Sequence, residues 1–348
     1  MAQLAIVTSS PASVEGGHLV IARSLVAAAR AAGHGAHLVL TPECEFGRQF
    51  SAYVATWRTA ANTIDGHRID RVISLRHPSY AVRHPDHVCW LNHTMREYYD
   101  LWPRFSAGLS PRGRLKERAK QFVIHGLDRW LLTHNVSQVI AQSRTIQARL
   151  AHDFGLQADV LLPPPPPRPY RFRRYGDFIF AVSRLTPLKR LDLLIRALAE
   201  APARHIRAVV AGEGECRTAL QELAAALGVS NRVLLPGRLS EEDLLDYLAE
   251  CRAVCFPTLA EDYGFVTVEA FASRKAVVTC IDSGGPAELV CDGTTGLVCE
   301  PNAGAVASAL ARLMDDAAFA ERLGSAAAVW VGQLTWPATL ARLLAGHL

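Results

Sequence analysis

Two carboxylates on either side of a glycine bend could do chemistry on a polar ligand. Glu261 follows the apolar run 252–256, which is short enough to be a buried strand, and Glu269 lies in a helical pattern over 265–273. Backbone N–H groups at the Gly264 bend, together with the helix dipole, favour an anion. The two glutamates repel an anion, so we expect them to accept hydrogen bonds from ligand hydroxyls. An anion flanked by hydroxyls describes a sugar phosphate or a nucleotide sugar. Solvated carboxylates in an ordinary α/β loop are the alternative.

The stretch 256–288 resembles the E-x7-E region of the family 4 glycosyltransferases, which have the GT-B fold. Glu261 and Glu269 have that spacing, and DSGGPAE at 282–288 resembles the loop that follows. The resemblance places Glu269 on the nucleotide ribose and Glu261 near the sugar hydroxyls. It also implies donor contacts from the residues between them: Tyr263, Gly264 and Phe265.

Earlier in the chain, a pair of cations lies between the predicted strand 177–182 and a predicted helix over 191–200. They are Arg184 and Lys189. Arginine offers a planar fork for two phosphate oxygens and lysine a mobile point charge, so Arg184 and Lys189 suit a diphosphate. Both resemble the family residues that hold the leaving pyrophosphate. We expect Arg190, beside them, to be solvated.

Three further groups resemble donor contacts. His93 stands in a polar run just after the strand 87–91, and carboxyl ends of strands are where open α/β sheets bind ligands. It resembles the histidine that faces the donor's reacting carbon, although a strand-end capping role is the alternative. Gly16 and Gly17 precede the helix 18–32 and resemble the family's first-domain loop that meets the donor diphosphate. An ordinary loop without a ligand explains the same two glycines. By resemblance the nucleotide base lies against the backbone of Gly237, Arg238 and Leu239.

Length and pattern predict a two-domain α/β protein. A chain of 348 residues is long for one core. A strand, a glycine loop, a helix and another strand open the chain and begin a doubly wound sheet. Five prolines at 163–167 form a stiff polyproline II segment that we interpret as a linker, with a partner's docking site as the rival. We predict two Rossmann-like doubly wound parallel-sheet domains facing each other across a cleft, the GT-B arrangement.

The predicted boundaries follow from these patterns. Residues 1–162 form an acceptor-side domain, 163–176 the linker, 177–333 the nucleotide-sugar domain, and 334–348 a helix that crosses back to the first domain. Other predicted elements are strands over 71–75, 139–143, 159–162, 207–211, 233–235 and 276–280. Predicted helices cover 52–62, 115–132, 145–154, 216–227 and 338–347, with a loop in the first half of 103–120, a turn at 284–286, and Ser240 capping a helix.

Charge is unevenly divided between the halves. Residues 1–170 hold 19 Lys and Arg against 12 Asp and Glu, a net of +7, and residues 171–348 hold 18 against 21, a net of −3. A basic half indicates an acidic partner: an anionic membrane surface, a phosphorylated acceptor or nucleic acid. A solvated arginine-rich surface explains it equally well. Among these partners we retain the first two and expect no nucleic acid.

Other composition features concern the compartment. No apolar run approaches the ~20 residues of a membrane span, and no signal peptide is recognisable. The eight cysteines contain no C-x-x-C pair, and four beside apolar runs read as buried thiols in a reducing compartment: Cys44, Cys89, Cys255 and Cys280. We therefore expect a cytoplasmic protein, peripheral at the inner face of the membrane if the basic half binds lipid.

The resemblance implies a retaining glycosyltransferase. A nucleoside-diphosphate sugar would be the donor, and a glycan or lipid-linked molecule the acceptor, in bacterial polysaccharide or glycolipid synthesis. No cofactor is implied. No two aspartates are separated by one residue, so the metal-binding Asp-x-Asp of the other major glycosyltransferase fold is missing and we expect no metal site.

Rival functions come from other classes. A nucleotide-sugar 2-epimerase of the same fold would need further acid–base groups at the sugar carbon. A non-catalytic nucleotide-sugar regulator would bind donor without turnover. A Rossmann dehydrogenase is weaker, because Gly-x-Gly-x-x-Gly is absent.

Overall fold

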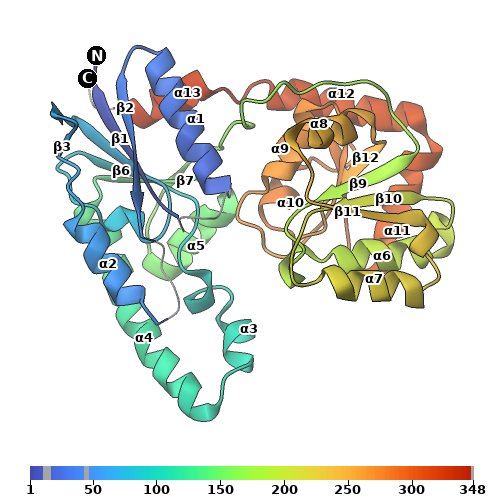
Figure 1. Ribbon diagram of the computed structural model, residues 1–348, viewed down its shortest axis with the longest axis horizontal. Helices are drawn as coiled ribbons and strands as arrows, with labels where there is room; N and C mark the ends of the chain where they lie inside the picture. The colour runs from blue at the N-terminus through green and yellow to red at the C-terminus, as the bar shows by residue number, and fades with distance from the viewer. Residues whose placement is uncertain (11–16, 43–46, 346–348) are drawn as a thin grey trace. The chain divides into compact units, whose positions relative to one another are not determined.

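The computed structural model describes residues 1–10, 17–42 and 47–345, and these divide into two compact units. One unit contains residues 1–163 and 336–348, and the other contains residues 164–335. Each unit is an α/β fold around a parallel sheet of six strands (Figure 1).

The first unit has the strand order β2-β1-β5-β6-β7-β8. Its strands are β1 (Gln3–Ser9), β2 (Gly35–Thr41), β5 (Arg71–Ser74), β6 (His87–Leu91), β7 (Gln138–Ala141) and β8 (Asp159–Val160), and β3 (Thr63–Ile64) with β4 (His67–Arg68) forms a separate antiparallel pair. Its helices are α1 (Gly17–Ala31), α2 (Gln49–Arg58), α3 (Trp102–Ala107), α4 (Pro111–Trp130), α5 (Arg144–Phe154) and α13 (Trp336–Leu344), with short turns η1 (Ser79–Ala81), η2 (Arg96–Tyr98) and η3 (Leu131–Asn135).

The second unit has the strand order β11-β10-β9-β12-β13-β14, so two strands lie beyond its first strand, where the first unit has one. Its strands are β9 (Phe178–Val182), β10 (Arg207–Ala211), β11 (Val233–Gly237), β12 (Ala253–Cys255), β13 (Val277–Cys280) and β14 (Gly296–Cys299). Its helices are α6 (Leu191–Ala199), α7 (Arg217–Ala226), α8 (Glu241–Glu250), α9 (Phe265–Ala272), α10 (Gly285–Leu289), α11 (Ala303–Asp315) and α12 (Ala317–Val331), with turns η4 (Pro187–Lys189), η5 (Ala201–Ala203) and η6 (Ser230–Arg232).

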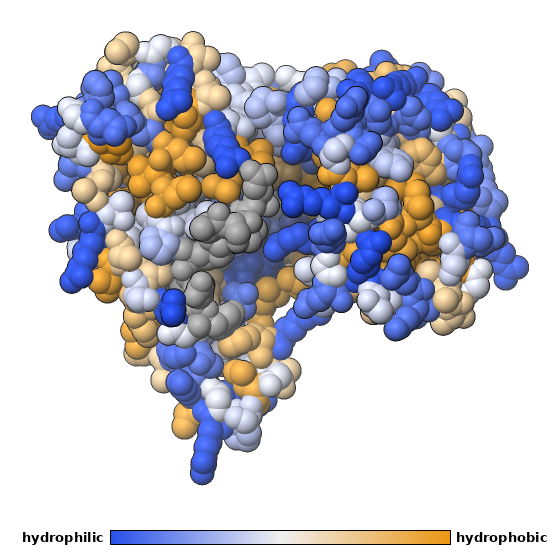
Figure 2. Space-filling view, viewed as in Figure 1, coloured by the Kyte–Doolittle hydropathy of each residue, from blue (hydrophilic) through white to orange (hydrophobic). Residues whose placement is uncertain are grey.

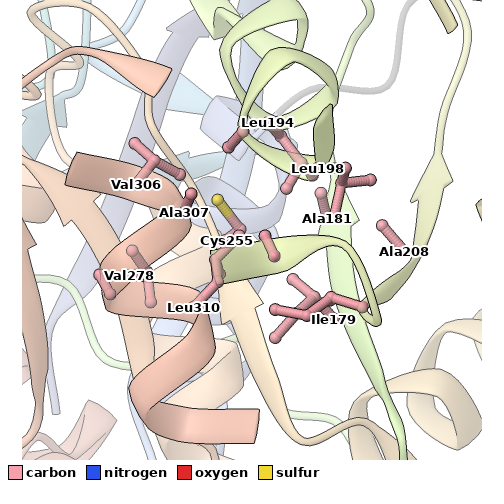
Figure 3. Packing of buried hydrophobic residues seen from close by; sticks show 14 of the residues in the cluster. Ile179, Ala181, Leu194, Leu198, Ala208, Cys255, Val278, Val306, Ala307 and Leu310 are labelled. Carbon is pink, nitrogen blue, oxygen red and sulfur yellow. The ribbon is translucent and has the colours of Figure 1, made fainter. Parts of the chain in front are cut away.

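A continuous apolar core holds the second sheet. Strand β9 reads FIFAV and its three central residues are buried, which is typical of a strand covered on both faces. In Figure 3 side chains of α6 and α11 meet those of β9, β12 and β13: Leu194, Leu198, Val306, Leu310, Ile179, Cys255 and Val278. Each such large side chain stabilises the fold by about 1.5–3 kcal/mol through its burial.

Strand β9 lies at the middle of the second sheet and marks its switch point. The chain runs outward from β9 to β10 and β11, then returns to pair β12 with the other side of β9. The loops after β9 and β12 therefore leave the same edge of the sheet in opposite directions. That edge is where doubly wound sheets bind ligands.

Helix ends follow the sequence in several places and depart from it in others. Ser240 Oγ accepts a bond from the Asp243 amide at 3.1 Å, which confirms the predicted cap of α8. The predicted loop in the first half of 103–120 is wrong, because α3 covers Trp102–Ala107 and α4 begins at Pro111. Proline is tolerated in a first helical turn, and the Ser110 hydroxyl caps α4 by accepting from the Gly113 amide at 3.2 Å.

Smaller corrections concern other segments. The predicted turn at 284–286 is the start of the short helix α10. The second helix covers Gln49–Arg58 rather than 52–62, and β14, α11 and α12 were not predicted. Three of the four cysteines expected to be buried thiols are so, namely Cys89, Cys255 and Cys280, and Cys44 lies outside the described residues.

Candidate active site

Lys189 and Glu261 come from neighbouring strand ends and meet as an ion pair. Lys189 closes the turn η4 after β9, and Glu261 stands in the loop after β12. The Lys189 Nζ donates to Glu261 Oε2 at 2.5 Å and lies 5.4 Å from the centre of the Phe256 ring. Both side chains keep some solvent contact, at 12% and 22% exposure. Arg184, in the same loop as Lys189, is exposed.

Arg190 contradicts the expectation that it is solvated. Its guanidinium makes two bonds to the Asp282 carboxylate, at 2.8 and 2.6 Å, and donates to the carbonyls of Pro257 and Thr258. Its side chain is 18% exposed. Arginine's planar fork fits this set of acceptors, so Arg190 joins the loops that follow β9, β12 and β13.

The backbone of the Glu261 loop is fixed by the segment after β13. The Glu261 amide donates to Ser283 O at 2.8 Å, and the Gly285 amide donates to Glu261 O at 2.8 Å. Gly284 has φ +71°, and a Cβ there would lie 2.5 Å from Glu261 O. Only glycine allows the two segments to approach this closely.

The N-terminus of α9 also depends on close packing. Gly264 precedes it with φ +86°, and a Cβ at this position would lie 2.7 Å from the Pro286 ring. Tyr263 is buried, and Phe265, which is half-buried, packs edge-on against its ring with 5.1 Å between centroids. Burial raises the pKa of Tyr263 well above its usual range, so its hydroxyl stays protonated.

Two buried hydroxyls near this helix end have unused hydrogen-bonding capacity. Thr258 lies in the loop after β12 and Thr267 in the first turn of α9, and both are 0% exposed. Among the described residues neither Oγ1 has a hydrogen-bond partner. Buried polar atoms are nearly always paired, so these two are consistent with a polar ligand or ordered water at this edge.

Glu269 faces residues that the sequence did not indicate. It is buried on α9, where Arg168 Nη1 forms a very short ion pair with its carboxylate and the Tyr170 hydroxyl donates to Oε1 at 3.2 Å. Burial raises the pKa of Glu269, and the nearby Arg168 charge opposes that rise. Arg168 also pairs with Glu241 at 3.2 Å. Because Arg168 and Tyr170 directly follow the proline run, no spacing pattern pointed to them.

The turn expected to meet the base is shaped by Gly237. This residue is buried with φ +86°, and its carbonyl accepts from the Gly212 amide at 2.8 Å. Arg238 is exposed and Leu239 half-buried. A Cβ on Gly212 would lie 1.8 Å from Ser183 O, so the loop after β10 runs directly against the loop that carries Arg184.

The first unit contains the remaining predicted residues. His93 lies two residues after β6, is half-buried, and donates from Nδ1 to Thr94 O at 2.7 Å, since a carbonyl can only accept. Gly17 is the exposed first residue of α1, and Gly16 lies outside the described residues. The structure therefore brings Lys189 and Glu261 together within the second unit.

A buried polar cluster adjoins His93. The His77 amide donates to His93 O at 3.1 Å, and the His77 ring contacts the hydroxyls of Tyr53 and Tyr80. Asp128 of α4 accepts from both hydroxyls and from that of Tyr99. Burial raises the pKa of Asp128 to about 6, although these hydrogen bonds oppose the rise. The cluster fixes the backbone on which His93 stands.

Among the described residues, no three His, Cys, Asp or Glu side chains converge on a position for a metal ion.

Comparison with known proteins finds a sequence-family model that matches the second unit. Residues 169–330 match the family model described as glycosyl transferases group 1. The chain is 33% identical to an alpha-D-kanosaminyltransferase of Streptomyces kanamyceticus over 44% of its length and 42% of that enzyme. It is 30% identical to a D-inositol 3-phosphate glycosyltransferase of Mycolicibacterium smegmatis over 70% of its length and 57% of that enzyme. The chain thus spans about half the length of these relatives.

Solved structures resemble the chain along nearly its whole length. Anabaena HepE in complex with UDP and glucose has a TM-score of 0.71 at 18% identity, covering 98% of this chain and 99% of that one. Sucrose-phosphate synthase from Thermosynechococcus elongatus has a TM-score of 0.76 at 17% identity, covering 98% and 97%. The chain therefore has the GT-B fold, and its residues 169–330 match the group 1 glycosyl transferases.

Proposed function

We propose that the protein is a retaining glycosyltransferase of family 4 that uses a nucleoside-diphosphate sugar. One observation carries the proposal: Lys189 and Glu261 meet at 2.5 Å at the switch point of a domain that matches group 1 glycosyl transferases. A cation for the diphosphate and a carboxylate for the sugar thus stand side by side where such sheets bind ligands.

In the proposed reaction the bond between the sugar's anomeric carbon and the diphosphate oxygen breaks. A bond from the acceptor oxygen forms on the same face of the sugar, and the acceptor proton passes to a leaving phosphate oxygen. Arg184, Lys189 and the N-terminus of α9 would stabilise the negative charge that grows on the diphosphate. Such preorganised charges need no rearrangement as the bond breaks.

The other site residues have positioning roles in this proposal. Glu261 would interact with the sugar hydroxyls and Glu269 with the ribose, while Gly237 to Leu239 would line the base. His93 would contact the donor sugar, and Gly17 the diphosphate. Arg190 would act through Asp282 by keeping the Lys189 and Glu261 loops in register. The acceptor would be a carbohydrate or a lipid-linked molecule, as in bacterial glycolipid or polysaccharide synthesis.

Incubation with nucleotide sugars and no acceptor tests the proposal. A panel of UDP-, GDP- and ADP-sugars is mixed with the full chain, and the products are separated by anion-exchange chromatography. Slow release of one nucleoside diphosphate with free sugar is expected. An epimerised sugar would identify an isomerase instead, and binding with no turnover, even with acceptors added, would identify a regulator.

We also propose that turnover needs no metal ion, since the Asp-x-Asp motif is missing. Activity should survive EDTA. Loss of activity on chelation, restored by magnesium or manganese, would contradict this part of the proposal.

A further inference from the structure

The outer face of α4 combines exposed apolar and basic side chains. α4 is 20 residues long, so it extends about 30 Å. Three large apolar side chains on it are solvent-exposed: Leu115 at 74%, Phe122 at 80% and Val123 at 50%. Side chains at these spacings share one side of a helix. Its opposite side packs into the unit through the buried residues Gln121, Ile124 and Asp128.

Basic residues flank this apolar strip. Five basic side chains of α4 are exposed: Arg112, Arg114, Lys116, Arg118 and Arg129. Both acidic residues of the helix are turned away from the strip. Asp128 is 0% exposed, and Glu117, 14% exposed, is occupied by Lys120 at 2.8 Å and the Tyr98 hydroxyl at 2.5 Å. The exposed side of α4 therefore carries positive charge with no opposing carboxylate of its own.

Helix α2 continues the apolar strip. Phe50 and Val54 are four residues apart on α2 and are 41% and 49% exposed. Trp57, one turn further, packs its ring against that of Trp130 at the end of α4, with 5.7 Å between centroids. The end of α4 meets α2 in Figure 1, and residues of high and low hydropathy are mixed over this end of the unit in Figure 2. We name the set Phe50, Val54, Leu115, Phe122, Val123 and Trp130, with the five exposed basic residues of α4, the α2–α4 face.

We propose that the α2–α4 face binds the surface of an anionic lipid bilayer. Contiguous exposed apolar residues mark an interaction surface, and a row of basic residues beside them selects a negatively charged partner. A helix with apolar side chains between cationic ones lies in the interfacial plane of a membrane. Among the described residues no helix is long and apolar enough to cross a bilayer, so this contact is with the surface only.

Charge and apolar burial make separate contributions to the affinity of the α2–α4 face for the membrane. Each Lys or Arg close to an anionic surface strengthens binding by about fivefold, and the attraction weakens once salt shortens the screening length from ~10 Å to ~3 Å. Phe122 and Leu115 would enter the headgroup region and contribute independently of salt. Binding of an acidic protein or a nucleic acid would depend on the basic residues but would not require Phe122 and Leu115.

Flotation of the full chain with vesicles tests the proposal. Phosphatidylcholine vesicles with and without phosphatidylglycerol are compared at about 0.1 M and about 1 M salt. We expect binding only with phosphatidylglycerol, weakened by salt. The double variant Arg112→Gln/Arg118→Gln should bind roughly 30-fold more weakly, and Leu115→Ser/Phe122→Ser at least about tenfold more weakly.

Matched controls lie in the second unit. Val329→Ser removes an apolar side chain that is 72% exposed, and Arg196→Gln removes a cation that is 53% exposed. Both should bind like the wild type, and thermal unfolding confirms that every variant is folded. No binding to phosphatidylglycerol vesicles, or binding that Leu115→Ser/Phe122→Ser leaves intact, overturns the proposal. So does a wild-type dimer that this same variant dissociates while vesicle binding is absent, since a second copy would then cover the face.

Discussion

At the scale of single residues, the two glutamates of the E-x7-E stretch have different environments. Glu261 is paired with Lys189 and keeps 22% solvent exposure, while Glu269 is buried against Arg168 and Tyr170. A carboxylate beside a mobile lysine can respond to charge that develops during a reaction. One fixed by arginine and tyrosine offers a constant hydrogen-bond acceptor.

The two glutamates should therefore fail in different ways. Glu269→Gln is expected mainly to raise the donor KM, by roughly tenfold or more, because its contact is the same in ground and transition states. Glu261→Gln is expected mainly to lower kcat, by about 100-fold, because its charge matters more as the sugar becomes positive. Michaelis kinetics on both variants check this, with thermal unfolding as a control because Glu269→Gln removes one of the two carboxylates that pair with Arg168. A kcat defect in Glu269→Gln with a KM defect in Glu261→Gln would exchange the two proposed roles. If neither variant has a defect, the E-x7-E stretch is not part of the active site.

His87 gives a residue-scale prediction about stability. Its Nδ1 donates to Asn135 O at 3.2 Å, its Nε2 accepts from the Ser74 hydroxyl at 2.8 Å, and burial lowers its pKa to about 4. Between about pH 4 and 6.5 the unfolded chain therefore binds more protons at His87 than the folded chain does. The free energy of unfolding consequently falls as pH falls through that window. The loss due to His87 between about pH 7 and pH 5 is about 2 kcal/mol.

Replacing His87 tests that window. The free energy of unfolding of His87→Gln should fall less than that of the wild type over the same pH range, as measured by urea denaturation. His152→Gln is the control, since the His152 side chain is 87% exposed and should leave the wild-type pH dependence in place. Equal pH dependence in His87→Gln and the wild type would show that His87 is not held neutral.

At the scale of elements, loops after parallel strands are held by close backbone approach. Gly284 and Gly293 make a matched pair, with φ of +71° and +69°. A Cβ on Gly284 would lie 2.5 Å from Glu261 O, whereas nothing lies within 4 Å of one on Gly293. The two glycines share the need for positive φ and differ in the space available.

Alanine substitutions at Gly284 and Gly293 should distinguish the cost of a positive φ from the cost of a steric clash. Gly293→Ala should cost about 1 kcal/mol of unfolding free energy, the usual penalty for a left-handed residue. Gly284→Ala should cost at least about 2 kcal/mol and also displace the Glu261 loop, since backbone must move. Chemical denaturation measures both. Equal costs would contradict the close approach of the two segments.

Elements also show how far the sequence could predict the site. Apolar runs and helix signals predicted most strands and placed the Lys189 and Glu261 loops at strand ends, because those patterns are local. Arg190 and Arg168 were missed because their partners, Asp282 and Glu269, are 92 and 101 residues away. Local pattern carries no information on such pairings. The start of α4 was missed because the proline and glycine near it suggested a loop, while the Ser110 cap decided otherwise.

At the scale of the whole molecule, the two units both contain a six-stranded parallel sheet but differ in charge. In each sheet the chain runs outward from its first strand and then returns to that strand's other side. The second unit gathers cations and carboxylates at the switch point, and the first presents basic and apolar side chains on the α2–α4 face. We propose that the second unit holds the donor and that the first meets the acceptor or the surface that carries it.

In the proposed reaction, Arg184 and Lys189 stabilise the leaving diphosphate. The most direct test of this role is kcat/KM for the donor identified in the screen, measured for Arg184→Ala, Lys189→Ala and the control Arg196→Ala, a cation on α6 that is 53% exposed. Removing either charge should lower kcat/KM by at least ~100-fold, comparable to losing one oxyanion donor, while the control stays near wild type. Near wild-type kcat/KM in either Arg184→Ala or Lys189→Ala would show that the replaced cation does not stabilise the diphosphate.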